Sequence, residues 1–127
     1  MPEYLNMSSV NLYNETCFKI SELVTKKYST SFSMGVSLFR KNLRPAIFSI
    51  YGFVRFADEI VDTFHDYNKE VLLNKFQEEI FDSIERGISF NPIIHSFVQT
   101  VNKFNIEKEH IEAFFYSMRL DIEKKVY

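Results

Sequence analysis

The sequence is poor in the residues that break or cross-link a chain. Of its 127 residues, three are glycine, three are proline and one is cysteine, and tryptophan is absent. So few glycines and prolines disfavour a hairpin-rich all-β fold, because tight turns depend on these residues. The single Cys17 cannot form an internal disulfide, which is typical of proteins from reducing compartments. Such a cysteine is most often a small buried hydrophobe.

The sequence also lacks an excess of one charge and a long apolar run. The net charge of -2 and the pI near 5.9 give no electrostatic basis for binding nucleic acid. No uncharged run reaches the roughly 18 residues that a membrane-spanning helix needs. The N-terminus has no basic segment followed by an apolar one, so no signal peptide is expected. We therefore expect a cytoplasmic protein.

Apolar and aromatic residues are plentiful, and their spacing is helical. Hydrophobic residues make up 46% of the chain, including 14 phenylalanines and 7 tyrosines, which is ample for a core. The periodicity predicts an all-α fold in which short connections bring neighbouring helices together antiparallel. Residues 28–41, with four serines and a glycine, read as a loop holding at most one short helix. Helices are expected at residues 9–27, from 42–44 to 64, 68–86, 92–104 and from 107 onward.

Several predicted helix ends carry recognisable capping residues. Ser9 is a candidate N-cap of the first helix. Gly87 is a natural left-handed residue after the third long helix. Asn91, which precedes Pro92, opens the next helix, and Asn105 closes it. Pro45 is tolerated in the first turn of the central helix.

The central helix leads into acidic residues. Ile47, Tyr51 and Val54 form one apolar stripe, and its next positions are Asp58 and Asp62. A second apolar stripe runs beside it, formed by Ala46, Ile50, Phe53, Ala57, Ile60 and Phe64. The helix is therefore predicted to lie deep in the core, where carboxylates need a cation or hydrogen-bond donors. Two carboxylates one turn apart suit a hard divalent cation such as Mg²⁺.

The same pattern has a simpler interpretation. Arg55 lies three residues before Asp58, within salt-bridge reach on a helix. The residues after Asp62 are polar and typical of a solvated helix end. Glu59 lies off the stripe, as a surface group or a neighbour of the acidic pair. The pattern alone leaves a buried metal site and a solvated acidic face both open.

Three segments, taken together, resemble the N-terminal part of the squalene/phytoene synthase family. They are Tyr-Ser-Thr-Ser-Phe-Ser at 28–33 followed by Arg44, Tyr-Gly-Phe-Val-Arg-Phe-Ala-Asp-Glu-Ile-Val-Asp at 51–62, and Ser-Met-Arg-Leu-Asp-Ile at 117–122 with Tyr127 beyond. That family carries an S-x-S-F segment, an apolar helix ending in Y-x-x-x-R-x-x-D-x-x-x-D, and an M-x-x-D-L-x-x-x-x-Y segment. The resemblance runs from about Tyr28 to the last residue.

The resemblance implies a fold and a reaction. The fold is an isoprenoid-synthase-type helical bundle, with residues 1–127 as the N-terminal half of one domain. Family members also carry a second acidic motif on a later helix, which this sequence does not contain. The reaction is the head-to-head condensation of two geranylgeranyl diphosphates to phytoene, in carotenoid biosynthesis. Squalene or dehydrosqualene synthesis from farnesyl diphosphate is the alternative. A non-catalytic helical fragment or interaction module is the alternative from another class.

Site roles also follow from the resemblance. It implies Asp58 and Asp62 as ligands of Mg²⁺ and catalytic residues, together with Arg55, whose guanidinium suits a diphosphate. The residues that match its substrate-binding positions are Ser29, Thr30, Ser31, Phe32, Tyr51 and Arg55. The aromatic rings suit an allylic cation. The partners it implies are an isoprenoid diphosphate and a peripheral membrane contact for product release. We also expect this chain alone to be inactive and to self-associate.

The remaining polar residues give weaker signals. His65, His95 and His110 show no mutual spacing typical of metal ligands. His65 is interpreted as a surface residue at a helix end, and His95 as a satisfied, partly buried histidine. Asp121 matches the family and is a candidate neighbour of the site. No glycine-rich phosphate loop is present.

Overall fold

The computed structural model describes the backbone of residues 3–124 and the side chains from Ser9 to Lys124. Within this range the chain forms helices and no strand, so the all-α prediction is confirmed. The helices are α1 (Glu3–Tyr28), α2 (Thr30–Val36), α3 (Arg44–Asp62), α4 (Lys69–Arg86), α5 (Pro92–Phe104) and α6 (Lys108–Lys124). None of the helices in this range is long and apolar enough to cross a membrane.

Most of the predicted helix ends are confirmed. Asn91 caps α5 by accepting hydrogen bonds from the backbone N–H groups of the first turn. Gly87 and Asn105 end α4 and α5 in the left-handed conformation, with φ of 82° and 54°. One boundary was predicted wrongly: Ser9 lies inside α1, because residues 3–8 contain no glycine or proline that would end the helix. The central helix α3 ends at Asp62, near the predicted Phe64.

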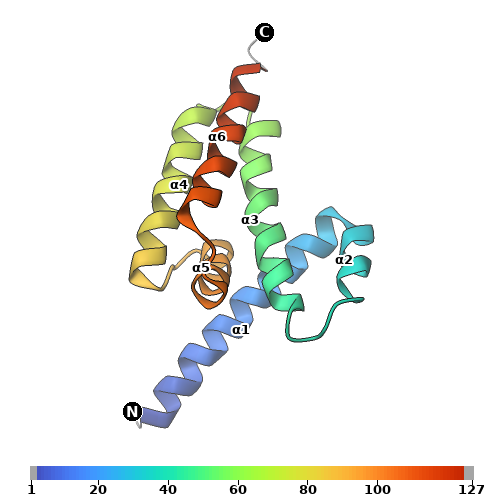
Figure 1. Cartoon of the computed structure of the whole chain (residues 1–127), viewed down its shortest axis with the longest axis vertical. Coiled ribbons are helices and arrows are strands. Elements are labelled where there is room, and N and C mark those ends of the chain that lie inside the picture. The colour runs from blue at the N-terminus through green and yellow to red at the C-terminus, as the bar shows by residue number, and fades with distance from the viewer. Residues whose placement is uncertain (1–2, 125–127) are drawn as a thin grey trace.

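The helices form an upright group and a crossing group (Figure 1). α3, α4 and α6 run side by side, with α4 antiparallel to the other two, while α5 is seen end-on and α1 passes beneath α3 and α5. Antiparallel packing is therefore confirmed for α3 and α4 but is wrong for α5. Gly87 at the end of α4 and Asn105 at the end of α5 turn the chain, and the packing of α5 on α1 and α3 places it crosswise. α2 packs beside the first half of α3.

An aromatic cluster centred on Phe53 of α3 packs four helices against one another. The ring of Phe53 stacks on Phe97 of α5, with centroids 4.1 Å apart and planes 9° apart. The same ring contacts Phe76 of α4 at 5.7 Å and Phe114 and Phe115 of α6 at 5.0 and 5.7 Å. Phe53 therefore contacts three other helices. The apolar side chains that these helices bury around Phe53 form the hydrophobic core, whose burial stabilises the packing of α3, α4, α5 and α6.

A seam of small and hydroxyl-bearing residues joins α1, α3 and α5. Ser21 of α1 shares a hydrogen bond of 2.7 Å with Ser96 of α5, and Ser49 of α3 shares one of 2.6 Å with Thr100. All four side chains are buried. A Cβ atom at Gly52 would lie 3.2 Å from the Ser21 hydroxyl, so the glycine lets α3 approach α1 closely. Cys17 is buried beside this seam on α1, as predicted.

His95 links the α4–α5 connection to α1. Its Nδ1 accepts the backbone N–H of Ser89 at 3.1 Å, so in the neutral ring Nε2 carries the proton and donates it to Asn14 Oδ1 at 2.6 Å. Tyr13 packs its ring on His95 and donates its hydroxyl to the carbonyl of Ser89. The histidine is thus buried and satisfied, which confirms the sequence interpretation.

Truncation of Phe53 tests the importance of the aromatic cluster. Phe53→Ala should lower the free energy of unfolding by about 3–5 kcal/mol, because it leaves a cavity in contact with three helices. Urea unfolding followed by circular dichroism measures this loss. Phe90→Ala, at a ring that is 96% exposed, is the control and should change stability by less than about 0.5 kcal/mol. Equal effects of both substitutions would contradict the assignment of the core.

The burial of His95 predicts a pH dependence of stability. Burial disfavours the charged ring and lowers the pKa of His95 below its ordinary value of 6.5. The unfolded chain then binds more protons than the folded one between the two pKa values. The His95 contribution should be fully present above pH 6.5 and be lost as the pH falls toward the folded-state pKa. Urea unfolding between pH 7.5 and pH 5 should show this loss, and His95→Asn should reduce it.

Candidate active site

The packing of α3 decides which of its faces carries the predicted site. Its buried residues are Phe48, Ser49, Gly52, Phe53, Ala57, Ile60 and Val61. The stripe of Ile47, Tyr51, Val54 and Asp58 lies beside this face and is only half-buried, while Asp62 is exposed. The prediction that the helix lies deep in the core therefore holds for one face of α3 and is wrong for the flank that carries the acidic residues. The other helices cover one side of α3, and α2 covers only part of the rest.

Arg55 is held in place from three directions. Its Nη2 donates to Glu59 Oε1 at 2.7 Å, and its Nη1 lies 3.9 Å from Asp58 Oδ2. The guanidinium carbon lies 4.8 Å from the centre of the Tyr28 ring, a cation–π contact. The Nε of Arg55 is buried and has no hydrogen-bond partner within the described part of the chain. The guanidinium is thus positioned mainly by its outer nitrogens and its flat face.

Glu59 is the centre of this network. Its carboxylate accepts hydrogen bonds from Arg55, from the hydroxyl of Tyr28 at 3.0 Å and from the hydroxyl of Thr63 at 3.1 Å. Burial opposes the ionisation of Glu59, but the hydrogen bonds from its three donors outweigh burial and lower its pKa. Through Glu59, the network holds Tyr28, the last residue of α1, against α3. It thereby positions the start of the serine-rich segment, which follows Tyr28, beside α3.

The serine-rich segment starts α2 and packs an aromatic ring on α3. The Oγ of Ser29 accepts the backbone N–H of Phe32 at 3.1 Å, and it lies 3.5 Å from the Oγ of Ser31. Ser29 therefore acts as the N-cap of α2, and Thr30 and Ser31 follow it as exposed residues. The ring of Phe32 stacks on Tyr51 of α3 at 4.8 Å. Two of the residues predicted to bind substrate are thus in direct contact.

Asp58 and Asp62 provide two carboxylates, which are too few to hold a metal ion without further ligands. Asp58 is about one-third exposed, at 32% of its side-chain surface, and Asp62 lies one turn further toward the end of α3. Among the side chains from Ser9 to Lys124, no group of three His, Cys, Asp or Glu residues would hold an ion by itself. Two carboxylates still fit Mg²⁺, which usually takes one or two protein ligands and completes its shell with water and phosphate oxygens.

The other residues singled out in the sequence have structural or exposed positions. Arg44 donates to the backbone carbonyls of Phe39 and Ser37 at 2.9 and 2.8 Å, so it braces the loop between α2 and α3. The Nδ1 of His65, in the connection after α3, lies 2.8 Å from the ammonium of Lys69, the first residue of α4. His110 and Asp121 are exposed on α6, and Tyr127 lies outside the described residues.

Two residues of the network were not among the predicted site residues, although Glu59 was interpreted as a surface group or a neighbour of the acidic pair. The spacing of Arg55 and Glu59, four residues apart, is a known salt-bridge signal that could have identified Glu59. Tyr28 carried no such signal, since its partner lies 31 residues further along the chain. Only the packing of α1 against α3 brings the two side chains together.

The network predicts a measurable coupling between α1 and α3. Glu59→Gln removes the ion pair with Arg55, and Tyr28→Phe removes one donor to the same carboxylate. Each should lower the free energy of unfolding by about 1 kcal/mol, since the groups are partly exposed. In a double-mutant cycle the two losses should not add, because both act on one carboxylate. Additive losses would show that Tyr28 and Glu59 do not act together.

Comparison with known proteins agrees with this arrangement. The squalene/phytoene synthase family profile matches residues 25–127. The chain is 24% identical to a chloroplastic phytoene synthase of Cucumis melo over 99% of its own length and 30% of that protein. It is 24% identical to a phytoene synthase of Arthrospira platensis over 87% of its own length and 36% of that protein.

A third relative is the chloroplastic phytoene synthase 2 of Zea mays, at 28% identity over 82% of the chain and 26% of that protein. The chain thus spans about a third of the length of these relatives. No solved structure matches the chain significantly. The family match covers most of the chain and includes α2, α3 and the residues around Arg55, so the chain belongs to the squalene/phytoene synthase family.

Proposed function

We propose that this chain forms the N-terminal wall of a prenyltransferase site that condenses two geranylgeranyl diphosphates head to head to phytoene. One observation carries the proposal. Arg55, Asp58 and Asp62 follow one another along the part of α3 that the rest of the fold leaves accessible. The names of the relatives, all phytoene synthases, support the choice of substrate. The complete activity is proposed for a longer protein that contains this segment.

The chemistry of the proposed reaction calls for the groups that lie here. An allylic diphosphate leaves as an anion, and bound Mg²⁺ would supply the positive charge that stabilises it. Asp58 and Asp62 would hold that ion through carboxylate oxygens. Arg55 would donate from its guanidinium to the phosphate oxygens, and Glu59 and Tyr28 hold that guanidinium beside Asp58.

The aromatic pair beside the acids suits the apolar, cationic part of the substrate. Phe32 and Tyr51 stack on each other between α2 and α3, and Tyr51 lies one turn before Arg55. Ring faces attract an allylic cation through their quadrupole without reacting with it. Ser29, Thr30 and Ser31 would face the diphosphate from the start of α2. The hydroxyl of Ser29 already caps α2, so Thr30 and Ser31 are the better candidates for phosphate contacts.

The metal requirement gives the sharpest test. In a longer protein containing this segment, product formation from geranylgeranyl diphosphate should need Mg²⁺ and stop in excess chelator. Asp58→Asn should raise the barrier by about 4 kcal/mol, which slows turnover roughly a thousandfold. It should leave the melting temperature nearly unchanged, since it keeps the side-chain shape. Asp82→Asn, at an exposed aspartate of α4, is the matched control and should not change turnover.

Several results would contradict the proposal. Full turnover in chelator would remove the metal from the mechanism. Equal effects of Asp58→Asn and Asp82→Asn would remove Asp58 from the site. Product from farnesyl diphosphate alone would replace the proposed substrate by the shorter one. An inactive but well-folded longer protein that binds neither diphosphate would favour the non-catalytic reading of this segment.

A further inference from the structure

A pocket with an excess of positive charge lies where the beginning of α3 meets α1, α2 and the loop after α2. Its volume is about 410 Å³. The charged residues of its lining are Lys19, Glu22, Lys26, Lys41 and Arg44. Within the described part of the chain, four cations thus surround this pocket with one carboxylate, although the whole chain has a net charge of -2. An excess of three positive charges around one cavity indicates a site for an anion.

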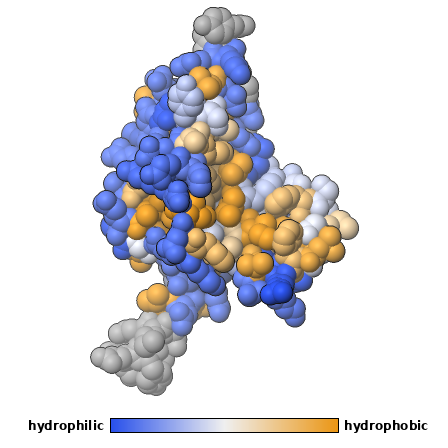
Figure 2. Space-filling model, viewed as in Figure 1, coloured by the Kyte–Doolittle hydropathy of each residue, from blue (hydrophilic) through white to orange (hydrophobic). Residues whose placement is uncertain are grey.

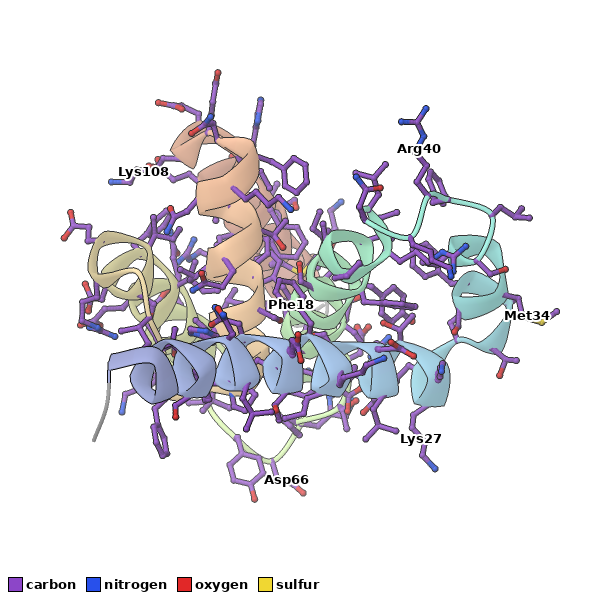
Figure 3. All side chains as sticks on the ribbon, turned by 90° about the horizontal axis from the view of Figure 1, so that it is seen from below. Phe18, Lys27, Met34, Arg40, Asp66 and Lys108 are labelled. Atoms are coloured by element: carbon purple, nitrogen blue, oxygen red, sulfur yellow. The ribbon has the colours of Figure 1, made fainter. Side chains whose placement is uncertain are left out.

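The charges reach the pocket from two sides. In Figure 2 a strongly hydrophilic patch adjoins the apolar surface of α2, where Figure 1 places the loop that carries Lys41. In Figure 3 Phe18 lies on the side of α1 that faces the helical body, and Lys27 extends from the opposite side. Phe18 lines the pocket, so its side of α1 is the pocket side. The charged residues that helical spacing places on that side are Lys19, Glu22 and Lys26.

Glu22 orients the two lysines of α1. Its Oε2 accepts a hydrogen bond from Lys26 Nζ at 2.7 Å, and its Oε1 lies 3.5 Å from Lys19 Nζ. The hydrogen bond from Lys26 is the main cause that lowers the pKa of Glu22, so the carboxylate stays charged at neutral pH. One carboxylate thus holds two ammonium groups beside the pocket and compensates only one of their charges.

Arg44 is fixed by the loop that it braces. Its Nε and Nη2 donate to the carbonyls of Phe39 and Ser37 at 2.9 and 2.8 Å. These two hydrogen bonds leave Nη1 as the end of the guanidinium that can reach a ligand. They also hold the loop that carries Lys41 against the pocket. Because the guanidinium is already ordered, it loses little side-chain entropy when it binds an anion.

The uncharged lining indicates what else the ligand carries. Phe18 is half-buried and Phe48 is buried, and together with Pro45 they form an apolar wall. Ser33 of α2 adds a hydroxyl to the same lining. A phosphate group has a larger charge and more acceptor oxygens than a carboxylate, so it suits lysines, a guanidinium and a hydroxyl better. The volume is at the small end of the range typical of ligand pockets, which indicates a compact molecule.

We propose that this pocket binds a small water-soluble organic phosphate, with the phosphate on the basic side and a compact apolar body against the aromatic wall. Lys26, Lys41 and Arg44 donate to the phosphate oxygens. The pocket is distinct from the candidate active site, because Arg44 and Arg55 lie about three turns, or roughly 16 Å, apart along α3. The proposal involves neither Mg²⁺ nor the carboxylates of α3, so it does not rest on the prenyltransferase reaction.

Isothermal titration calorimetry of the 127-residue chain with phenyl phosphate tests the proposal. Excess chelator is present throughout, so that binding through Mg²⁺ at Asp58 and Asp62 does not contribute. We expect one phenyl phosphate per chain and weaker binding as salt rises. Inorganic phosphate should bind about tenfold more weakly, because it has no ring to cover the apolar wall. Benzoate, which has the ring and a smaller charge, should also bind more weakly than phenyl phosphate.

Substitutions in the lining should change the affinity in opposite directions. Lys26→Gln/Lys41→Gln should weaken the binding of phenyl phosphate by at least about tenfold, since it removes two charged donors. Glu22→Gln should strengthen binding by about fivefold, because it removes a negative charge beside the phosphate. A substitution that merely disturbed the fold would not raise the affinity, so this gain is specific to the proposed role.

Matched controls lie outside the pocket. Lys75→Gln/Lys124→Gln removes two exposed charges from α4 and α6, and Arg55→Gln removes the guanidinium of the candidate active site. Neither control should change the affinity for phenyl phosphate. Circular dichroism should show the helical spectrum of the parent chain for every variant that is compared.

Other results would overturn the proposal. A folded chain that binds neither phenyl phosphate nor inorganic phosphate at millimolar concentration has no such site. Equal losses in the two double-lysine variants would show that binding follows the total charge and not this pocket. A loss of binding in Arg55→Gln alone would place phenyl phosphate in the candidate active site. Weaker binding by Glu22→Gln would contradict the role of net charge in the pocket.

Discussion

The stacking of Phe53 on Phe97 sets the rotation of α3 about its own axis. Once this ring points into the core, the helical repeat places Ala57, Ile60 and Val61 inward as well. The stripe that contains Tyr51 and Asp58 must then lie on the flank. The chemistry of the candidate site thus depends on an apolar contact that includes none of its residues. A shift of that contact by one position would turn Arg55 away from the ring of Tyr28.

Local signals in the sequence predicted the helices well and their arrangement less well. Asn68, Gly87, Asn91 and Asn105 act on the backbone within a few residues, so the ends of α4 and α5 could be placed from the sequence. The crossing of α5 depends on how several helices pack at once, and no local pattern encodes it. The prediction that α3 lies deep in the core was partly wrong for the same reason. An apolar stripe indicates which residues can be buried, and neighbouring helices decide which of them are.

In the candidate site, too, local sequence signals predicted some residues, while the role of others depends on how the helices pack. Asp58, Asp62 and Arg55 could be predicted as site residues because helical spacing and family resemblance can both be read along the sequence. The contact of Phe32 with Tyr51 shows that the serine-rich segment and the central helix meet. Glu59 was interpreted as a surface group or a neighbour of the acidic pair, yet its carboxylate accepts hydrogen bonds from both Arg55 and Tyr28. Its pairing with Arg55 follows a spacing that the sequence shows, but its hydrogen bond with Tyr28 comes from another helix, and single-sequence reasoning has no access to such pairs.

The buried hydroxyl seam between α1, α3 and α5 has a mechanical consequence. Sliding any of these helices along its neighbours would break a hydrogen bond between two hydroxyls that have no water to replace it. The three helices therefore behave as one block with a fixed register. α2 joins this block through the ring of Phe32 and the braced loop, and those contacts are exposed or half-exposed. Among the helices that pack on this block, α2 therefore has a weaker attachment than the three helices have to one another.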